Sequence, residues 1–385
     1  MRNVCLLGAS GSIGKQTLDE LKKNRLNFEL VAFSVGKKTQ KIHHVLSVFP
    51  RVKHICINKK EKLSYYKKTY PNISFYYGDD GLVELIKNSK ADMVVNALVG
   101  FVGLKPTLFA IENDLDVYLA NKESLVVGGE LVNTLLNKSK GRIFPIDSEH
   151  SALKKCLMVD DQEIDKLVLT ASGGAFRNLS RDELVNVKAA DALKHPTWKM
   201  GPKITIDCAT MVNKAFEIIE AHYLFQYPFD KIGIKLHDES YVHSYILYKN
   251  GLMRLDVGKP DMRVPIRYAL HEYNLPFKTV LTDDLSKLKN CHFHDFDINR
   301  YPVIKWAKTV IEQKGTYGAV FNAASEEADK AFLRNEIAFL DIEKIINSLM
   351  TCHKNIIHPS YEQIAEVDRI TRQQVKTMIE KGDIR

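Results

Sequence analysis

A glycine-rich turn directly after the first apolar run constrains the fold of this chain more than any other feature. Val4 to Leu7 is predicted to be a strand and leads into the segment 8–14, Gly-Ala-Ser-Gly-Ser-Ile-Gly, after which a helix is predicted to begin near Lys15. Glycines at this place let the backbone approach a pyrophosphate, which the amides and dipole of the following helix favour. The pattern therefore predicts a dinucleotide-binding turn; a glycine-rich turn without a ligand is the alternative.

The first 147 residues repeat this pattern of strand and helix. Short apolar runs at 4–7, 30–33, 54–57, 93–95, 117–119 and 143–146 alternate with polar segments that are compatible with helices. Such alternation is typical of a parallel sheet with crossover helices. We therefore predict an α/β protein whose N-terminal domain, 1–147, is a doubly wound dinucleotide-binding domain.

The rest of the chain is predicted to form two further domains. The region 148–275 mixes strands at 166–170 and 244–248 with helices and is interpreted as a central α+β domain that carries the chemistry. A linker, 276–298, has weak periodicity. Helical patterns at 303–314, 326–334, 342–350 and 360–381 then predict a C-terminal helical bundle, 299–385, whose last helix begins with a capping box of Ser360 and Gln363.

Composition excludes several functional classes. The chain has 55 Lys and Arg against 47 Asp and Glu, a net charge of +8, but the basic residues are scattered in pairs, so we expect no nucleic-acid partner. The longest apolar-leaning stretch, 93–104, falls short of the ~20 residues that span a bilayer, so no membrane partner is expected. The 6 cysteines are far apart and form no CxxC pair, which favours a reduced protein in the cytoplasm.

The end of the second predicted strand indicates which dinucleotide is bound. An NAD enzyme places a ribose-binding acid about 20 residues after the glycines, but here the sequence is Ser34, Val35, Gly36, Lys37 and Lys38. Two lysines and a serine suit a 2'-phosphate, so NADPH is preferred over NADH. An exposed basic loop would leave the choice open.

A short-chain-type sugar epimerase or dehydrogenase is the alternative function, because such enzymes also open with a glycine-rich turn and use a Tyr-x-x-x-Lys pair. The pair occurs at Tyr118/Lys122, Tyr227/Lys231, Tyr245/Lys249 and Tyr301/Lys305. The first copy starts in a predicted strand, where four residues span about 13 Å, whereas the chemistry needs adjacent groups. The other copies lie outside the nucleotide-binding half or contain a proline.

Carboxylates in two segments are candidate ligands for a cation. Asp147 and Glu149 follow the last strand of the N-terminal domain, at the edge where ligands of open α/β sheets bind. They converge on one cation only if a turn carries them, and capping of the following helix is the alternative. Glu217 lies in the segment 207–217, which is predicted to begin a helix. By spacing alone its partner is Lys214, as on a solvated face.

Two loops between these segments carry groups that suit an anionic substrate. Ser172, Gly173 and Gly174 form a turn that is able to aim amides at an anion. The segment 195–201, His-Pro-Thr-Trp-Lys-Met-Gly, contains one of the 2 tryptophans. A lid that closes over substrate has this composition; a surface loop with Trp198 half-buried is the alternative.

These motifs, in this order, resemble the 1-deoxy-D-xylulose 5-phosphate reductoisomerase family. The matching blocks lie at 8–14, 96–100, 120–124, 145–151, 172–174, 195–201, 209–217, 258–263 and 322–324. Asn121-Lys122-Glu123-Ser124 and Pro260-Asp261-Met262-Arg263 are together highly specific.

The resemblance implies an NADPH-dependent enzyme that also needs a divalent cation, Mg²⁺, Mn²⁺ or Co²⁺, and that forms a homodimer through its central domain. It implies that a carbon–carbon bond of a small sugar phosphate, 1-deoxy-D-xylulose 5-phosphate, is cleaved and re-formed. The branched aldehyde is then reduced to 2-C-methyl-D-erythritol 4-phosphate. This reaction belongs to the non-mevalonate biosynthesis of isoprenoid precursors.

The same resemblance implies a role for each candidate site residue. The cation would be held by Asp147, Glu149 and Glu217, which act in catalysis together with Lys122. Substrate binding falls to Lys122, Ser148, Glu149, Ser172, His195, Trp198, Cys208, Asn213, Lys214 and Glu217. Cofactor binding falls to Gly8, Ser10, Gly11, Ser12, Ile13, Gly36, Lys37, Lys38, Asn121, Glu123 and Gly201.

The chain departs from the family pattern at several positions. Cys208 stands where the family usually has a phosphate-binding serine, Ala9-Ser10 replaces Ser-Thr, Asp238-Glu239 replaces Pro-Gln, and Ser325 replaces an asparagine. None of these changes removes a carboxylate or Lys122, so we expect an effect on affinity rather than on reaction type. A protein that binds NADPH without turnover is a further hypothesis.

Overall fold

The computed structural model describes residues 1–158, 162–198, 200–274 and 290–384. The chain forms two compact units. The first comprises Met1–Ser124, Val132–Asp147 and Asp261–Leu275, and the second comprises Leu125–Leu131, Ser148–Pro260 and Pro276–Arg385. The described part of 261–275 therefore packs with the N-terminal unit. The sequence-based boundaries at 147, 275 and 298 stay a prediction, and the predicted linker lies largely outside the described residues.

The first unit is built on a parallel sheet, whose described strands have the order β4-β3-β2-β1-β5-β6-β7. The strands are β1 (Arg2–Leu7), β2 (Phe28–Val35), β3 (His54–Ile57), β4 (Ser74–Tyr77), β5 (Met93–Asn96), β6 (Asp116–Leu119) and β7 (Ile143–Pro145). Every neighbouring pair is parallel. The predicted doubly wound sheet is confirmed, and its strand order reverses between β1 and β5, where such sheets bind ligands.

One strand of this sheet, β4, is not among the predicted ones. It is an edge strand with the sequence SFYY, of which only Phe75 is buried. A run of four residues with one buried side chain gives little alternation to detect. The other predicted strands are confirmed.

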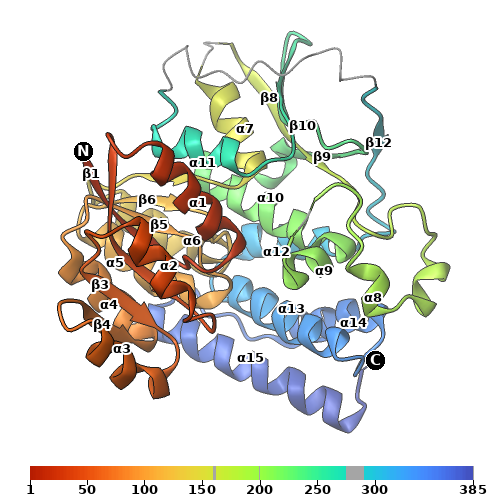
Figure 1. Ribbon diagram of the computed structural model, residues 1–385. Coiled ribbons are helices and arrows are strands. Elements are labelled where there is room, and N and C mark those ends of the chain that lie inside the picture. Colours follow the sequence, from red (N-terminus) through yellow and green to blue (C-terminus); the bar gives the residue numbers. More distant parts are fainter. Residues whose placement is uncertain (159–161, 199, 275–289, 385) are drawn as a thin grey trace. The chain divides into compact units, whose positions relative to one another are not determined.

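Helices cover the sheet of the first unit; those from the first part of the chain are red to orange in Figure 1, and α11 is teal. They are α1 (Ser12–Lys23), α2 (Lys41–Val48), α3 (Leu63–Thr69), α4 (Gly78–Ser89), α5 (Leu104–Glu112) and α11 (Arg263–Leu270), with 3-10 turns η1 (Lys60–Lys62) and η2 (Phe101–Gly103). The guanidinium of Arg267 on α11 donates to the fully buried carboxylate of Glu20 on α1 at 2.8 Å. This ion pair and the apolar face of α11, which includes Ile266 and Leu270, attach the segment to the first unit.

The second unit contains a mixed sheet, whose described strands have the order β11-β10-β8-β9-β12. They are β8 (Ile164–Ala171), β9 (Ile232–His237), β10 (Val242–Tyr248), β11 (Met253–Val257) and β12 (Phe293–Asp295). The predicted strands at 166–170 and 244–248 are confirmed as parts of β8 and β10. Strand β12 lies in the segment that was predicted to be a linker.

The helices of the second unit include those that carry the candidate site. They are α7 (Ser148–Leu157), α8 (Ala189–Ala192), α9 (Pro202–Thr210), α10 (Val212–Phe225), α12 (Ile304–Gln313), α13 (Tyr317–Leu333), α14 (Phe339–Cys352) and α15 (Tyr361–Lys381), with 3-10 turns η3 (Asp182–Asn186) and η4 (Phe229–Lys231). Helix α6 (Glu123–Leu136) has residues in both units.

The C-terminal helices form the predicted bundle. Helix α13 packs against α14 and α15, and the three blue helices lie side by side in Figure 1. The capping box of Ser360 and Gln363 is confirmed. Helix α13 begins at Tyr317 rather than near 326, and a side chain at Gly318 would meet the backbone oxygen of Val126 at 1.9 Å. Small residues there allow this close helix packing.

The segment 207–217 is not the start of one helix, and this prediction was wrong. Helix α9 ends at Thr210, Met211 has a left-handed backbone with φ of 64°, and α10 begins at Val212. Cys208 therefore lies at the carbonyl end of α9, whereas Asn213 lies at the amide end of α10. The left-handed residue has no glycine to reveal it in the sequence.

Within the described residues, no helix is both long enough and apolar enough to cross a membrane.

Candidate active site

The glycine-rich turn follows β1 at the carboxyl edge of the first sheet. Gly8 has a φ of 85°, and a side chain there would meet Ala97 O at 2.5 Å. A side chain at Gly14 would meet Gly8 O at 2.2 Å, so the turn packs tightly on its own helix. Helix α1 begins at Ser12, with Gly11 preceding it, which leaves the candidate residues Ser10 and Ile13 on either side of the helix start.

The turn is tied to the end of β2. The amide of Gly8 donates to Ser34 Oγ at 2.8 Å, and the amide of Ala9 donates to Ser34 O at 2.9 Å. Gly36 follows β2, and the side chains of Lys37 and Lys38 after it are exposed. The two lysines therefore take no part in the buried core, and they lie just beyond the end of the strand that adjoins the turn.

Asn121 and Glu123 hold two loops of the first unit together. Asn121 Nδ2 donates to Gly100 O at 3.1 Å and to Glu123 Oε2 at 3.0 Å. Glu123 Oε1 accepts from the amide of Gly100 at 3.0 Å. These side chains, predicted to contact the cofactor, thus fix the loops that follow β5 and β6 at the same edge as the glycine-rich turn.

Lys122 lies between them and forms an ion pair with Asp147, which follows β7. Both side chains are nearly buried, with 8% and 10% of the side-chain surface exposed. Tyr118, the partner of Lys122 in the alternative function, lies in β6, and its hydroxyl accepts from Arg2 Nη1 at 2.7 Å. Burial raises the pKa of Tyr118. Tyr118 is therefore poorly suited to act as a proton donor to a substrate.

Three of the candidate carboxylates form a group. Asp147 is in a bend directly before α7, Glu149 is in the first turn of α7, and Glu217 is on α10. One oxygen of each lies within 4.8 Å of the others. A turn thus carries Asp147 and Glu149 together, as the sequence requires for a shared cation. Ser148 lies between them, and its hydroxyl donates to Glu149 Oε2 at 2.6 Å.

Two polar side chains of α10 contact these carboxylates. Lys214 Nζ lies 3.3 Å from Glu149 Oε1 and also forms an ion pair with Glu217. Asn213 Nδ2 donates to Glu217 Oε1 at 2.5 Å. Lys214 and Glu217 are 3% and 1% exposed, so the pair predicted by spacing exists but does not lie on a solvated face.

Ser172 and His195 form the second part of the site. The amides of Thr197 and Trp198 donate to His195 Nδ1 at 3.2 and 2.9 Å, so the proton of the neutral ring is on Nε2, which lies 3.0 Å from Ser172 Oγ. The same Oγ accepts from the amide of Gly174 at 3.2 Å. A hydroxyl has two acceptor positions and one proton. Ser172 therefore keeps its own proton for a further acceptor.

The turn at Ser172 packs against the end of α9. A side chain at Gly174, whose φ is 70°, would lie 2.5 Å from Cys208 O. The backbone of Cys208 therefore adjoins the turn, and its side chain is half-buried. Gly201 precedes α9 and accepts from Thr205.

The segment 195–198 contacts other parts of the second unit, to which it belongs. The ring of Trp198 lies 6.0 Å from the ring of His243, and Thr197 Oγ1 lies 3.2 Å from Ser240 Oγ. Lys199, within the predicted lid, lies outside the described residues. Whether the segment moves over a substrate stays a prediction.

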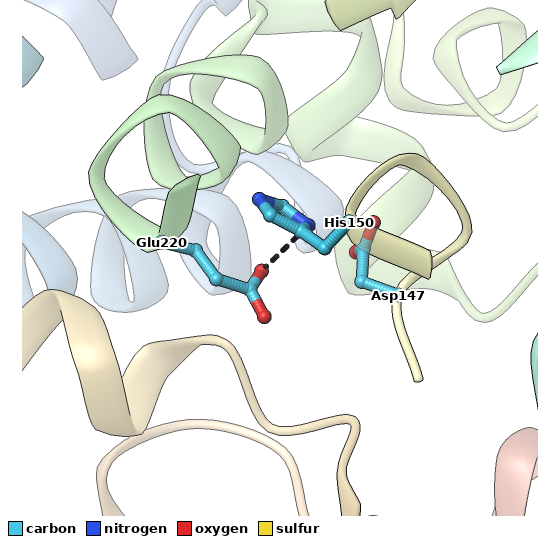
Figure 2. Close-up of side chains that lie close together, drawn as sticks. All are labelled: Asp147, His150 and Glu220. Atoms are coloured by element: carbon cyan, nitrogen blue, oxygen red, sulfur yellow. Dashed lines mark ion pairs between the residues drawn. The ribbon is translucent and has the colours of Figure 1, made fainter. Parts of the chain in front are cut away.

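Sequence reasoning missed two buried residues beside the carboxylates, His150 and Glu220. His150 is on α7, Glu220 is on α10, and Figure 2 shows the carboxylate of Glu220 directed at the imidazole. Both are fully buried. Ligand atoms of Asp147, His150 and Glu220 also lie within 4.8 Å of one another. A spacing signal existed, because Glu220 lies three residues after Glu217 on the same helix.

Family models match most of the chain. A model described as 1-deoxy-D-xylulose 5-phosphate reductoisomerase matches residues 4–129, and models of the C-terminal domains of the same enzyme match 143–225 and 257–374.

Similar proteins and structures cover the whole length. A 1-deoxy-D-xylulose 5-phosphate reductoisomerase of Bacillus thuringiensis subsp. konkukian is 43% identical over 98% of this chain and 100% of its own length. The enzyme of Lysinibacillus sphaericus is 42% identical over the same shares. A DOX-P reductoisomerase crystal structure with NADPH, fosmidomycin and magnesium has a TM-score of 0.91 at 31% identity, covering 99% of this chain and 98% of that one. The enzyme of Zymomonas mobilis with NADPH has a TM-score of 0.90 at 34% identity, covering 98% and 99%.

Proposed function

The chain belongs to the 1-deoxy-D-xylulose 5-phosphate reductoisomerase family, and we propose that Asp147, Glu149 and Glu217 hold the divalent cation on which its reaction depends. The protein is an NADPH- and metal-dependent enzyme that converts 1-deoxy-D-xylulose 5-phosphate to 2-C-methyl-D-erythritol 4-phosphate. The convergence of the three carboxylates is the observation that carries the assignment of the metal site.

The donor set fits such a cation. It consists of carboxylate oxygens only. Mg²⁺ and Mn²⁺ prefer oxygen ligands, whereas Zn²⁺ is more often held by sulfur and nitrogen ligands. Two ammonium groups contact these carboxylates: Lys122 pairs with Asp147, and Lys214 pairs with Glu149 and Glu217. When bound, a divalent cation supplies positive charge that polarises substrate oxygens.

Lys122 and Lys214 would then interact with the substrate rather than with carboxylates alone. Lys122 is on the segment that follows β6 and contacts Asp147, so we propose that it orients the reacting hydroxyl groups. Lys214 is at the amide end of α10, where an anion is also favoured by the helix dipole. It therefore suits the phosphate group of the substrate, together with Asn213.

Ser172 and His195 would complete the phosphate site. The Ser172 hydroxyl has its acceptor positions occupied by the His195 ring and the Gly174 amide, which directs its proton to an acceptor such as a phosphate oxygen. Cys208 adjoins the same turn, and Trp198 on the neighbouring segment would exclude water from the bound substrate.

The NADPH would bind along the carboxyl edge of the first sheet. The pyrophosphate would face the amides at Ser10, Gly11, Ser12 and Ile13, and the 2'-phosphate would face the exposed Lys37 and Lys38. Bound NADPH supplies the hydride for the reduction. Asn121, Glu123 and Gly201 would support or contact the cofactor.

We propose a homodimer whose interface includes β11, the outer strand of the second sheet. In the described residues β11 pairs with β10 on one side. Its alternate side chains Met253, Leu255 and Val257 are 60%, 42% and 45% exposed. An apolar edge strand favours pairing with another chain. We propose that a second copy of this chain covers it, and that the dimer is cytoplasmic, since none of the six cysteines, which all lie in the described residues, is in a disulfide.

The test is consumption of NADPH in the presence of 1-deoxy-D-xylulose 5-phosphate after removal of metals with a chelator. Activity should be lost on removal and restored by Mn²⁺ or Mg²⁺. Turnover that persists in the chelator would contradict the metal site and favour a short-chain-type mechanism, whereas cofactor binding without turnover in either condition would favour a non-catalytic role.

A further inference from the structure

A buried imidazole connects the two helices that carry Glu149 and Glu217. His150 directly follows Glu149 on α7, and its Nε2 lies 2.8 Å from the backbone oxygen of Glu217 on α10. Its Nδ1 lies 3.3 Å from Glu220 Oε2, one turn further along α10. Figure 2 shows Glu220 and His150 facing each other from these helices. One side chain of α7 thus contacts two turns of α10.

The partners of the ring determine where its protons lie. A backbone oxygen only accepts, so Nε2 must carry a proton and donate it to Glu217 O. Nδ1 lies 3.3 Å from Glu220 Oε2, so a protonated ring and the Glu220 carboxylate form a buried ion pair. Because both side chains are fully buried, loss of either one would leave the other in the interior without its ion-pair partner.

The ring orientation is restricted further by Phe225. The rings of His150 and Phe225 are stacked, with centroids 6.3 Å apart and planes 14° from parallel. Rotation of the imidazole would therefore break the stack as well as both polar contacts. The separation of α7 and α10 at Glu149 and Glu217 is fixed by this arrangement.

We propose that Glu220 is a positioning residue for the cation site, which acts through His150 and does not bind the cation itself. This inference rests on the proposed function, because it takes Glu149 and Glu217 as the ligands. Glu220 keeps His150 Nε2 on the backbone of Glu217, and His150 in turn keeps the two ligand-bearing helices at a fixed distance. Groups that orient ligands in this way contribute to metal affinity without contacting the metal.

Two substitutions of Glu220 separate positioning from ligation. Glu220→Gln keeps an amide that can donate to or accept from Nδ1, so the bridge persists and Mn²⁺ affinity should stay close to that of the unchanged protein. Glu220→Leu removes the bridge and should weaken Mn²⁺ binding about 10- to 100-fold. Both affinities are measured without turnover, by electron paramagnetic resonance of free Mn²⁺. In turnover assays the KM of Glu220→Leu for Mn²⁺ should rise, while its affinity for NADPH does not change.

A matched control exists on the same helix. His222 of α10 contacts the backbone oxygen of Tyr227 through Nδ1 at 2.7 Å and is partly buried. His222→Phe removes a comparable contact outside the bridge, so it should lower the unfolding temperature and leave Mn²⁺ affinity unchanged.

The outcomes distinguish the possible failures. If Glu220→Gln binds Mn²⁺ as weakly as Glu220→Leu, Glu220 is a ligand and the positioning role is wrong. If Glu220→Leu unfolds at a lower temperature but binds Mn²⁺ normally when folded, its role is only structural. If the unchanged protein binds no Mn²⁺, or if Glu217→Gln binds it normally, the proposed metal site itself is wrong.

Discussion

The ammonium of Lys214 contacts the carboxylate of Glu217 from one turn away on α10, and both side chains are almost fully buried. Spacing alone predicts this pair on any exposed helix, where it would stabilise little. In a buried position the pair offsets the desolvation of two charges only with further partners, and here Glu149 is the second partner of Lys214. The pair therefore belongs to a charge cluster and not to a helix surface.

We expect Glu217→Gln to remove metal-dependent turnover while NADPH still binds. A neutral amide is a poorer ligand for a hard cation, and the glycine-rich turn lies in the other unit. Turnover is measured with added Mn²⁺, and NADPH binding by its fluorescence. Glu366→Gln is the control, because Glu366 pairs with Arg369 in an exposed ion pair on α15. If the activity of Glu217→Gln stays within a few fold of that of the unchanged enzyme, Glu217 is not a metal ligand, and its role is the ion pair with Lys214.

Motifs that follow strand ends could be located from the sequence, because the carboxyl edge of a parallel sheet is reached at the last residue of each strand. This holds for the turn at Gly8 and for Asp147 after β7. The break at Met211 could not be predicted, because a left-handed residue is usually marked by glycine. The partners of His150 could not be predicted either, since Glu217 is 67 residues away and only helix packing brings it there.

Cofactor preference should depend on Lys37 and Lys38. Replacing both with Ala should raise the KM for NADPH and barely affect NADH, because a charge-assisted contact contributes about 1.5 to 3 kcal/mol, or roughly 10- to 150-fold. Lys67 and Lys68, an exposed pair on α3, provide the control. Equal losses with NADPH and NADH would show that Lys37 and Lys38 do not contact the 2'-phosphate.

The proposed homodimer depends on the exposed side chains of β11. Leu255→Lys should shift the protein from dimer to monomer in sedimentation, because an ammonium cannot be buried in an apolar contact without a partner. Ile370→Lys on α15 is the control, since Ile370 is 41% exposed and Leu255 is 42% exposed. A monomer before substitution, or a dimer that both variants keep, would contradict an interface at β11.

Stability should fall in mild acid because of His195. Burial, with a smaller contribution from Arg177, lowers the pKa of His195 from 6.5 to about 4. Below pH 6.5 the unfolded chain therefore takes up a proton that the folded chain takes up only near pH 4, so protons favour unfolding in this interval. The unfolding temperature of His195→Gln should fall less between pH 6.5 and 4 than that of the unchanged protein. Parallel curves would show that His195 titrates normally.

A substitution of Cys208 tests the proposed phosphate site. Its backbone adjoins the turn at Ser172 to Gly174, but it lies at the carbonyl end of α9, where the helix dipole disfavours an anion. A favourable contact with a phosphate there must come from a donated hydrogen bond, and a thiol is a weaker donor than a hydroxyl.

Cys208→Ser should therefore add a hydrogen bond of about 0.5 to 1.5 kcal/mol, which lowers the KM for substrate roughly two- to tenfold with kcat nearly unchanged. A packing role of Cys208 would give a different pair of results. If the half-buried thiol packs as a small apolar group, the serine hydroxyl would lower the unfolding temperature and leave KM where it was. That pair of measurements would remove Cys208 from the phosphate site.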